Sequence, residues 1–180
     1  VFVPDDMVVG EIGQGWKQVT SELALERSGP ERYMTTFPLF TELMRRLGAA
    51  PDARAAEMVG SLTARLWSLR RMSLAIAMTL DPGPDSANGA GSTPGDLAPA
   101  ATVDLATEAA LVKDLGTFYE REIIDAARLL FEVEPTPDAA DTFERYLAET
   151  IVCAPMSTIR GGTTQVLRSL IARKLLGPLK

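Results

Sequence analysis

The chain has 180 residues, 46% of them hydrophobic and 23% charged, which is enough to bury one substantial core as a single globular domain. The net charge of −6 argues against nonspecific nucleic-acid binding, because neutralising phosphates requires clustered Lys and Arg. The absence of histidine excludes histidine metal sites and the Ser-His and Cys-His catalytic pairs. A single cysteine, Cys153, excludes an internal disulfide, and the lack of a long apolar run excludes a membrane span. We therefore expect a cytoplasmic domain in which Cys153 is a small buried side chain.

The chain opens with an extended, β-branched pattern. The segment VFVPDDMVVGEIGQG is punctuated by Pro4, Gly10, Gly13 and Gly15, which is typical of a short strand followed by a turn. Because this pattern is already under way at Val1, it suggests a piece of a longer protein.

From residue 14 onward the apolar residues follow a helical period, which predicts helices near 14–28 and 30–47 and a long bundle helix over 53–80. Residues 82–101, rich in Pro and Gly, predict a mobile connector. A further long helix should cover 103–132, another should start at a cap on Thr136 or Asp138 and run to Ala154-Pro155, and the last should cover 164–176. The predicted fold is all-α, an antiparallel four-helix-type bundle with a short N-terminal β-strand remnant.

The same period predicts the core. On the helix over 103–132, one face carries a stripe of small and apolar residues: Ala109, Val112, Gly116, Tyr119, Ile123, Ala126 and Leu130. Four large apolar residues elsewhere are also expected in the core: Phe37, Trp67, Met72 and Met78.

One carboxylate interrupts the apolar face of the first predicted helix. Glu26 shares a stripe with Trp16 and Val19, and this position would aim it at the bundle interior. A buried carboxylate is costly unless it is paired or protonated, and such groups can abstract a proton from carbon. The alternative is a structural ion pair with Arg27, Arg32 or an arginine of another helix, and spacing alone favours that ion pair.

A glycine pair opens the last predicted helix, in the stretch IRGGTTQVLRSLIARKLLG, residues 159–177. A helix N-terminus offers unpaired N–H groups and a positive dipole end, and glycines let a ligand approach the main chain, so an anion or an oxygen-rich cofactor could bind there. The alternative is an ordinary helix cap, which the short Gly-Gly-Thr pattern by itself favours.

The two ends of the helical region resemble acyl-CoA dehydrogenases. The stretch VFVPDDMVVGEIGQGWKQVTSELALER is similar to the junction at which the middle β domain of that family, ending in V-x-V-P and a G-E-x-G-x-G turn, enters the C-terminal domain. The stretch GGTTQVLRSLIARKLLG resembles the family's closing signature, a G-T-[ST]-[EQ]-[IV] start and a helix ending in L-L-G. The resemblance covers nearly the whole chain. It implies that residues 1–12 are the end of the middle β domain and linker, and residues 13–180 the C-terminal helical bundle domain.

The resemblance implies an FAD-dependent oxidoreductase that dehydrogenates an acyl-CoA thioester between Cα and Cβ, in fatty-acid or related β-oxidation. In many members the base is a glutamate just before the final G-T motif, where this chain has Gly161. Other members place the base on the first helix before an arginine, and the matching positions are Glu26 and Arg27. The resemblance thus implies Glu26 as base, Arg27 as support for the loop over 160–162, and the Gly161 N–H as donor to the thioester carbonyl.

The cofactor-binding residues implied by the resemblance follow directly in the chain. Gly162, Thr163 and Gln165 match positions near the flavin or its adenosine portion. Two family motifs that contact FAD between subunits are absent: TTFPLFTELMRRLG stands in place of R-x-x-F-G, and FERYLAETIVCAPMST in place of Q-x-x-G-G-x-G. Such shortened domains resemble those of actinobacterial-type dehydrogenases that assemble as mixed tetramers.

Three functions are therefore expected alternatives: a catalytic subunit that uses Glu26, a noncatalytic partner subunit of a heteromeric acyl-CoA dehydrogenase, and a helical oligomerisation module without a redox role. The implied partners are an acyl-CoA substrate, the N-terminal and middle domains of the same protein, and further subunits of a homo- or heterotetramer. The isolated chain is expected to be inactive, because the other walls of the family's active site lie in domains that these residues do not include.

Overall fold

The computed structural model describes residues 3–80 and 104–177. Within these ranges the chain forms α-helices and short 3-10 turns and no strand. In chain order the elements are η1 (Asp5–Met7), α1 (Gly15–Ser28), η2 (Pro30–Arg32), α2 (Phe37–Leu47), α3 (Ala53–Leu80), α4 (Leu105–Leu130), α5 (Thr142–Ser157) and α6 (Thr164–Leu176). The all-α class is confirmed, and the connector predicted over 82–101 lies outside the described residues.

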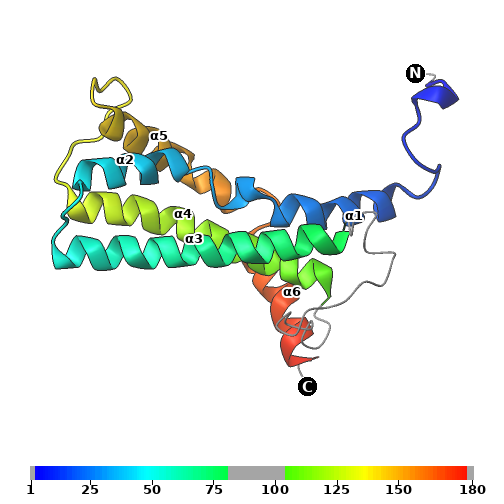
Figure 1. The fold of residues 1–180 in the computed structure, drawn as a ribbon. Coiled ribbons are helices and arrows are strands. Elements are labelled where there is room, and N and C mark those ends of the chain that lie inside the picture. Colours follow the sequence, from blue (N-terminus) through cyan, green and yellow to red (C-terminus); the bar gives the residue numbers. More distant parts are fainter. Residues whose placement is uncertain (1–2, 81–103, 178–180) are drawn as a thin grey trace.

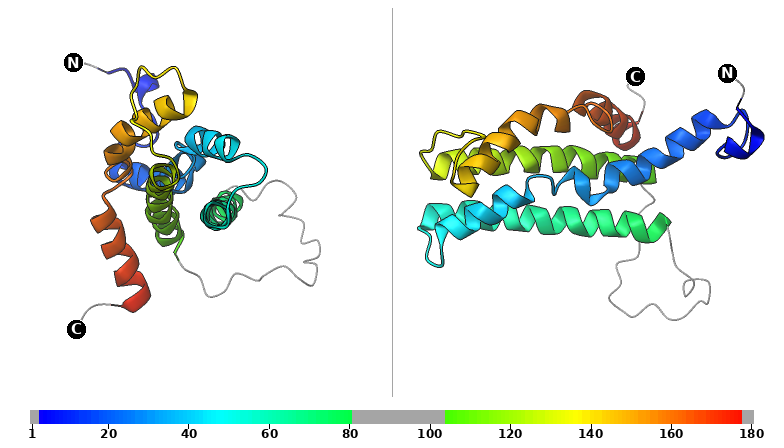
Figure 2. Two further views of the ribbon diagram at one scale, coloured as in Figure 1. Left: turned by 90° about the vertical axis from the view of Figure 1, so that its left-hand side faces the viewer. Right: turned by 90° about the horizontal axis from the view of Figure 1, so that it is seen from above.

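Helix α4 is the centre of the bundle. It runs antiparallel to α3, while α1 and α2 follow one another along the side of this pair and α5 lies beside α2 (Figure 1). Helix α6 leaves the bundle at a steep angle after the turn that ends α5 (Figure 2). Because α4 contacts α1, α2, α3, α5 and α6, it is buried on most of its circumference.

The hydrophobic core follows from this central position. Of the stripe predicted on α4, all members are buried except Leu130, which is half-buried. The core is completed by apolar residues of α2, α3 and α5, among them Leu39, Leu43, Leu62, Leu69, Ile76, Phe143 and Leu147. In the described part of the chain, no helix is long and apolar enough to cross a membrane.

The predicted N-terminal strand remnant is wrong for the described residues. Asp5–Met7 form a single 3-10 turn, and the segment that precedes α1 projects from the end of the bundle (Figure 1). A strand requires a neighbouring strand for its hydrogen bonds, and none is present in the described ranges. The first turns of α1 are uncovered as well, so that Trp16 is 82% exposed and Val19 is also exposed.

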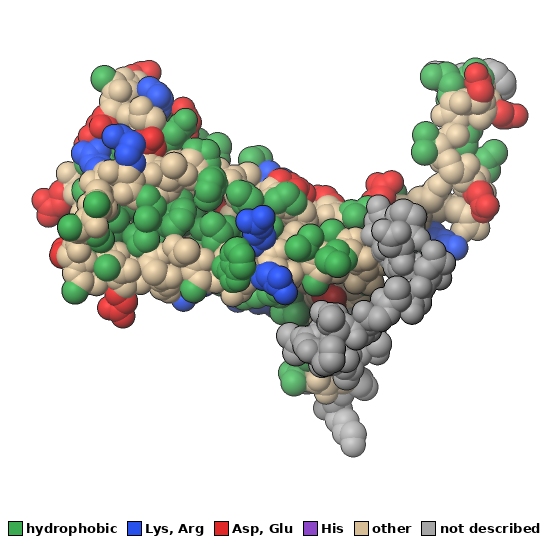
Figure 3. All heavy atoms as spheres, viewed as in Figure 1, with side chains coloured by type: hydrophobic (Ala, Val, Ile, Leu, Met, Phe, Trp, Pro, Cys, Tyr) green, Lys and Arg blue, Asp and Glu red, His purple; other side chains and the backbone are tan. Residues whose placement is uncertain are grey.

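Several residues expected in the core lie at the surface. Trp67 is 62% exposed, Met78 and Phe37 are exposed, and Cys153 is an exposed free thiol. Figure 3 shows many hydrophobic side chains in view on one face of the long helices. On α3, Trp67 and Met78 lie on the side of the helix away from the buried Leu62, Leu69 and Ile76, and no described element covers them.

Helix α5 begins and ends later than predicted. Its N-cap is Asp141, whose Oδ1 accepts a hydrogen bond from the Glu144 N–H at 3.1 Å, and Asp138 is an exposed residue of the preceding turn. Pro155 lies inside the last turn, and the helix continues to Ser157. A proline near a helix end removes one donor but does not force the helix to stop.

We expect Asp141→Ala to lower the thermal unfolding midpoint, because the first turn of α5 loses its side-chain acceptor. Asp138→Ala, the matched control, should change the midpoint little. The Glu144 N–H and, more weakly, the Arg46 guanidinium hold the pKa of Asp141 below its ordinary value. Because the pKa of Asp141 is lower in the folded state, the stabilisation by its carboxylate is complete above the unfolded-state pKa of about 3.9. This stabilisation is lost as the pH falls through the folded-state pKa.

Differential scanning calorimetry of the two variants and the parent, from neutral pH down to about pH 3, checks this expectation. The difference in unfolding midpoint between Asp141→Ala and the parent should become smaller as the pH is lowered. Equal midpoints for the two alanine variants at neutral pH would contradict the assignment of the cap.

Candidate functional site

The last turn of α1 meets the turn between α5 and α6. Arg27 Nε donates a hydrogen bond to the Gly161 carbonyl oxygen at 2.9 Å, a contact between residues 134 positions apart. Gly161 and Gly162 have φ of 72° and 110°, a region that residues with a side chain rarely adopt. The turn therefore requires glycine at both positions, and Arg27 fixes it against α1.

The Glu26 carboxylate lies directly beside this turn. Its Oε1 is 3.5 Å from the point that a Cβ on Gly161 would occupy, and Arg27 Nη2 is 3.5 Å from the equivalent point on Gly162. Burial lowers the pKa of Arg27, and the neighbouring Glu26 acts in the opposite direction. Four of the six predicted site residues, from the two ends of the helical region, thus share one location.

The orientation of Glu26 differs from the expectation. Its side chain is 41% exposed, and Oε1 forms an ion pair with Nη2 of Arg32 at 2.5 Å. Arg32 Nε also donates to the Glu26 backbone carbonyl at 2.7 Å. Glu26 is therefore not a lone carboxylate in the interior, because the face of α1 on which it lies is largely uncovered and a buried arginine pairs with it.

Arg32 is the buried member of this pair, with only 5% of its side chain exposed. Its Nη1 has no hydrogen-bond partner among the described residues and lies 3.7 Å from the Cβ point of Gly161. The guanidinium therefore lies against both the predicted base and the glycine turn. Sequence reasoning had placed Arg32 only among several possible partners of Glu26.

A buried lysine that sequence reasoning missed holds the end of α5. Lys113 Nζ donates to the Ser157 carbonyl and, at 3.0 Å, to the Thr117 hydroxyl. Burial, and after it the charge of Arg32, lowers the pKa of Lys113. The sequence did contain a signal for this burial. Lys113 and Glu120 are seven residues apart, about two helical turns, and each directly follows a buried residue of the predicted stripe, Val112 and Tyr119.

The start of α6 combines a cap with free donors. The Thr163 hydroxyl oxygen accepts a hydrogen bond from the Val166 N–H at 3.3 Å, so Thr163 is the N-cap and the predicted cap exists. Gln165 is exposed in the first helical turn. The Gly161 N–H donates to no acceptor in the described ranges.

The fold and this site together define an all-helical bundle in which α1 brings a carboxylate and an arginine, and η2 a second arginine, to a glycine turn before the last helix. No family model and no solved structure matches the chain. The chain is 28% identical over 182 residues to a protein named acyl-CoA dehydrogenase FadE34 from Mycobacterium tuberculosis. This match covers 98% of the chain and 22% of that curated relative, so the chain is distantly similar to part of an acyl-CoA dehydrogenase.

Proposed function

We propose that residues 13–180 are the C-terminal helical domain of an FAD-dependent acyl-CoA dehydrogenase and supply the base for α,β-dehydrogenation of an acyl-CoA thioester. The observation that carries the proposal is the position of the Glu26 carboxylate beside the Gly161 turn, although the two residues lie far apart in the chain. The distant similarity to part of an acyl-CoA dehydrogenase supports it.

Each residue of the site has a distinct task in this proposal. The thioester carbonyl would accept a hydrogen bond from the Gly161 N–H, and this bond strengthens as negative charge develops on the oxygen. Glu26 would remove the α proton through Oε2, because Oε1 is held by Arg32 and Oε2 receives no hydrogen bond from the described residues. Arg27 would keep the donor in place through its bond to the Gly161 carbonyl.

Part of a cofactor site fits the start of α6. Gly162 has no side chain, Gln165 is exposed, and the positive end of the helix suits a cofactor rich in oxygen atoms. When bound, FAD would supply the acceptor for the β hydride. At the place of the missing R-x-x-F-G motif, the two residues directly before α2 are Thr35 and Thr36 rather than an arginine. We propose that further cofactor contacts come from the N-terminal and middle domains or from another subunit.

A second candidate, the noncatalytic partner subunit, is favoured by the ion pair between Glu26 and Arg32. A carboxylate held at 2.5 Å by a buried guanidinium is already satisfied without substrate. In that case the glycine turn and the arginines would stabilise the domain, and a partner chain would supply the base.

Purification of the polypeptide as its gene encodes it, alone and with a co-expressed acyl-CoA dehydrogenase chain, tests the proposed function. We expect bound flavin in at least one preparation, with anaerobic bleaching of its absorbance by some acyl-CoA thioester. Flavin in neither preparation would contradict the proposal. Bleaching only with the partner chain, and unaffected by loss of the Glu26 carboxylate, would assign the noncatalytic role.

A further inference from the structure

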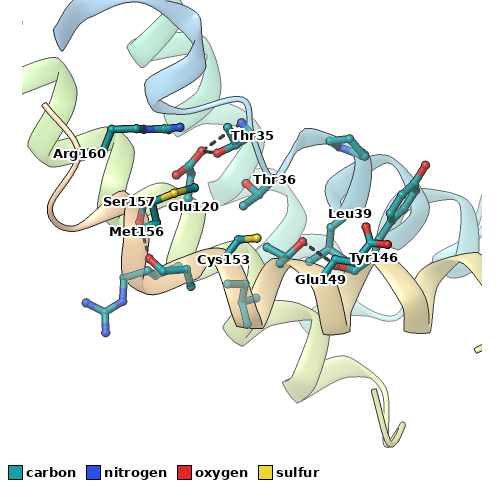
Figure 4. A pocket seen from close by; sticks show the side chains of 15 residues that line it. Thr35, Thr36, Leu39, Glu120, Tyr146, Glu149, Cys153, Met156, Ser157 and Arg160 are labelled. Atoms are coloured by element: carbon teal, nitrogen blue, oxygen red, sulfur yellow. Dashed lines mark hydrogen bonds between the residues drawn. The ribbon is translucent and has the colours of Figure 1, made fainter. Parts of the chain in front are cut away.

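A cavity of about 270 Å³ lies between α2, α4 and α5 (Figure 4). Leu39 of α2, Ile124 of α4 and Cys153 of α5 contribute to its walls. None of the six predicted site residues lines it. The cavity is therefore separate from the contact between Glu26 and the glycine turn.

A buried carboxylate lines this cavity. Glu120 is 3% exposed, and its Oε1 accepts hydrogen bonds from the Thr35 hydroxyl and, at 3.0 Å, from the Thr35 N–H. Figure 4 shows both bonds reaching the same oxygen. Oε2 receives none from the described residues, and burial raises the pKa of Glu120. Oε2 is not one of the fully buried oxygens that lack a partner, so it is open to the cavity, where a donor group on a ligand can reach it.

Cations near the carboxylate decide which kind of donor suits it. Arg160 lines the cavity and donates through Nη2 to the Glu31 carbonyl at 2.9 Å, while its buried Nε has no partner in the described ranges. The charges of Arg160 and Lys113 both act on Glu120 and offset its negative charge. A neutral donor therefore suits the site better than a cation.

We propose that this cavity binds a neutral, mainly apolar small molecule that carries one hydroxyl group. The hydroxyl donates to Oε2 of Glu120, and the apolar body lies against Leu39 and Ile124. The volume of about 270 Å³ equals roughly nine waters at about 30 Å³ each, which corresponds to a ligand of about ten non-hydrogen atoms. The inference holds whether or not the chain takes part in dehydrogenation.

Alkylation of Cys153 provides a direct test, because this exposed thiol lines the cavity and is the chain's single cysteine. The rate of its reaction with iodoacetamide is followed by mass spectrometry of the peptide that contains it, in the polypeptide as its gene encodes it. The probes are 1-octanol and its isomer heptyl methyl ether, which is the same size but has no O–H. We expect saturating 1-octanol to slow the reaction about fivefold or more and the ether to slow it much less.

Variants separate this site from general surface effects. Ala154→Leu, which fills the cavity, should abolish protection by 1-octanol, whereas Ala64→Leu on the exposed face of α3 should not. In Glu120→Gln the Thr35 N–H and hydroxyl should still donate to the side-chain oxygen, so the amide NH₂ group takes the place of Oε2. An NH₂ group cannot accept the hydroxyl hydrogen, and the preference for the alcohol over the ether should disappear. No protection of the parent, equal protection by the two isomers, or undiminished protection in Ala154→Leu would each overturn the proposal.

Discussion

Under the proposed function, Glu26→Gln in the polypeptide as its gene encodes it is expected to lower the turnover of an acyl-CoA thioester by about 10²–10⁴-fold, the usual contribution of a positioned general base. The amide has the size of the carboxylate and can still accept a hydrogen bond from Arg32, which pairs with it at 2.5 Å, but it cannot take the α proton. Because the change leaves the start of α6 untouched, flavin content should match that of the parent. Steady-state reduction of an electron-acceptor dye and the flavin absorption spectrum measure the two quantities.

Glu22→Gln is the matched control, because Glu22 lies about one turn earlier on α1 and is exposed. It should leave turnover within about twofold of the parent. A Glu26→Gln enzyme that retains more than about a tenth of the parent activity would remove Glu26 from the chemistry and favour the noncatalytic partner.

Gly116→Ala should destabilise the bundle by about 1–3 kcal/mol, the usual cost of forcing extra atoms into a packed core. A Cβ at this position of α4 would lie 2.5 Å from the Arg32 carbonyl oxygen and 3.1 Å from the Tyr33 Cβ. The nearest obstacle is backbone, so α4 and η2 must separate.

Gly60→Ala is the control for Gly116→Ala, since a Cβ there meets nothing within 4 Å. Gly60 lies inside α3, where alanine favours the helix by about 0.5–1 kcal/mol, so this variant should be slightly more stable than the parent. Urea denaturation measures the free energy of unfolding of both variants, which should fall for Gly116→Ala and rise slightly for Gly60→Ala. Two variants with equal free energies of unfolding would contradict the close approach of α4 to η2.

The long and terminal helices were predictable because their signals are local. Helices α3 and α6 have the bounds that the periodicity predicted, and α6 stops at Gly177. The start of α5 was misplaced because Thr136, Asp138 and Asp141 are all acceptable caps, and the choice depends on how the helix docks on α2 and α4.

The candidate site was predictable only in part. The resemblance singled out Glu26, Arg27 and the glycine turn, but no local pattern shows that Arg32 rather than another arginine pairs with Glu26. That choice depends on Gly116, which lets α4 approach the backbone of η2 and bury Arg32 beside the turn.

By itself the sequence determined the helices, the central stripe of α4 and the residue types available for chemistry, because period, caps and composition act within a few residues. The tertiary structure alone decided that Cys153 is exposed, that Glu26 is half-exposed in an ion pair, and that a separate cavity contains Glu120. A helical period shows which residues share a face, but burial and pairing depend on which distant segment packs against that face.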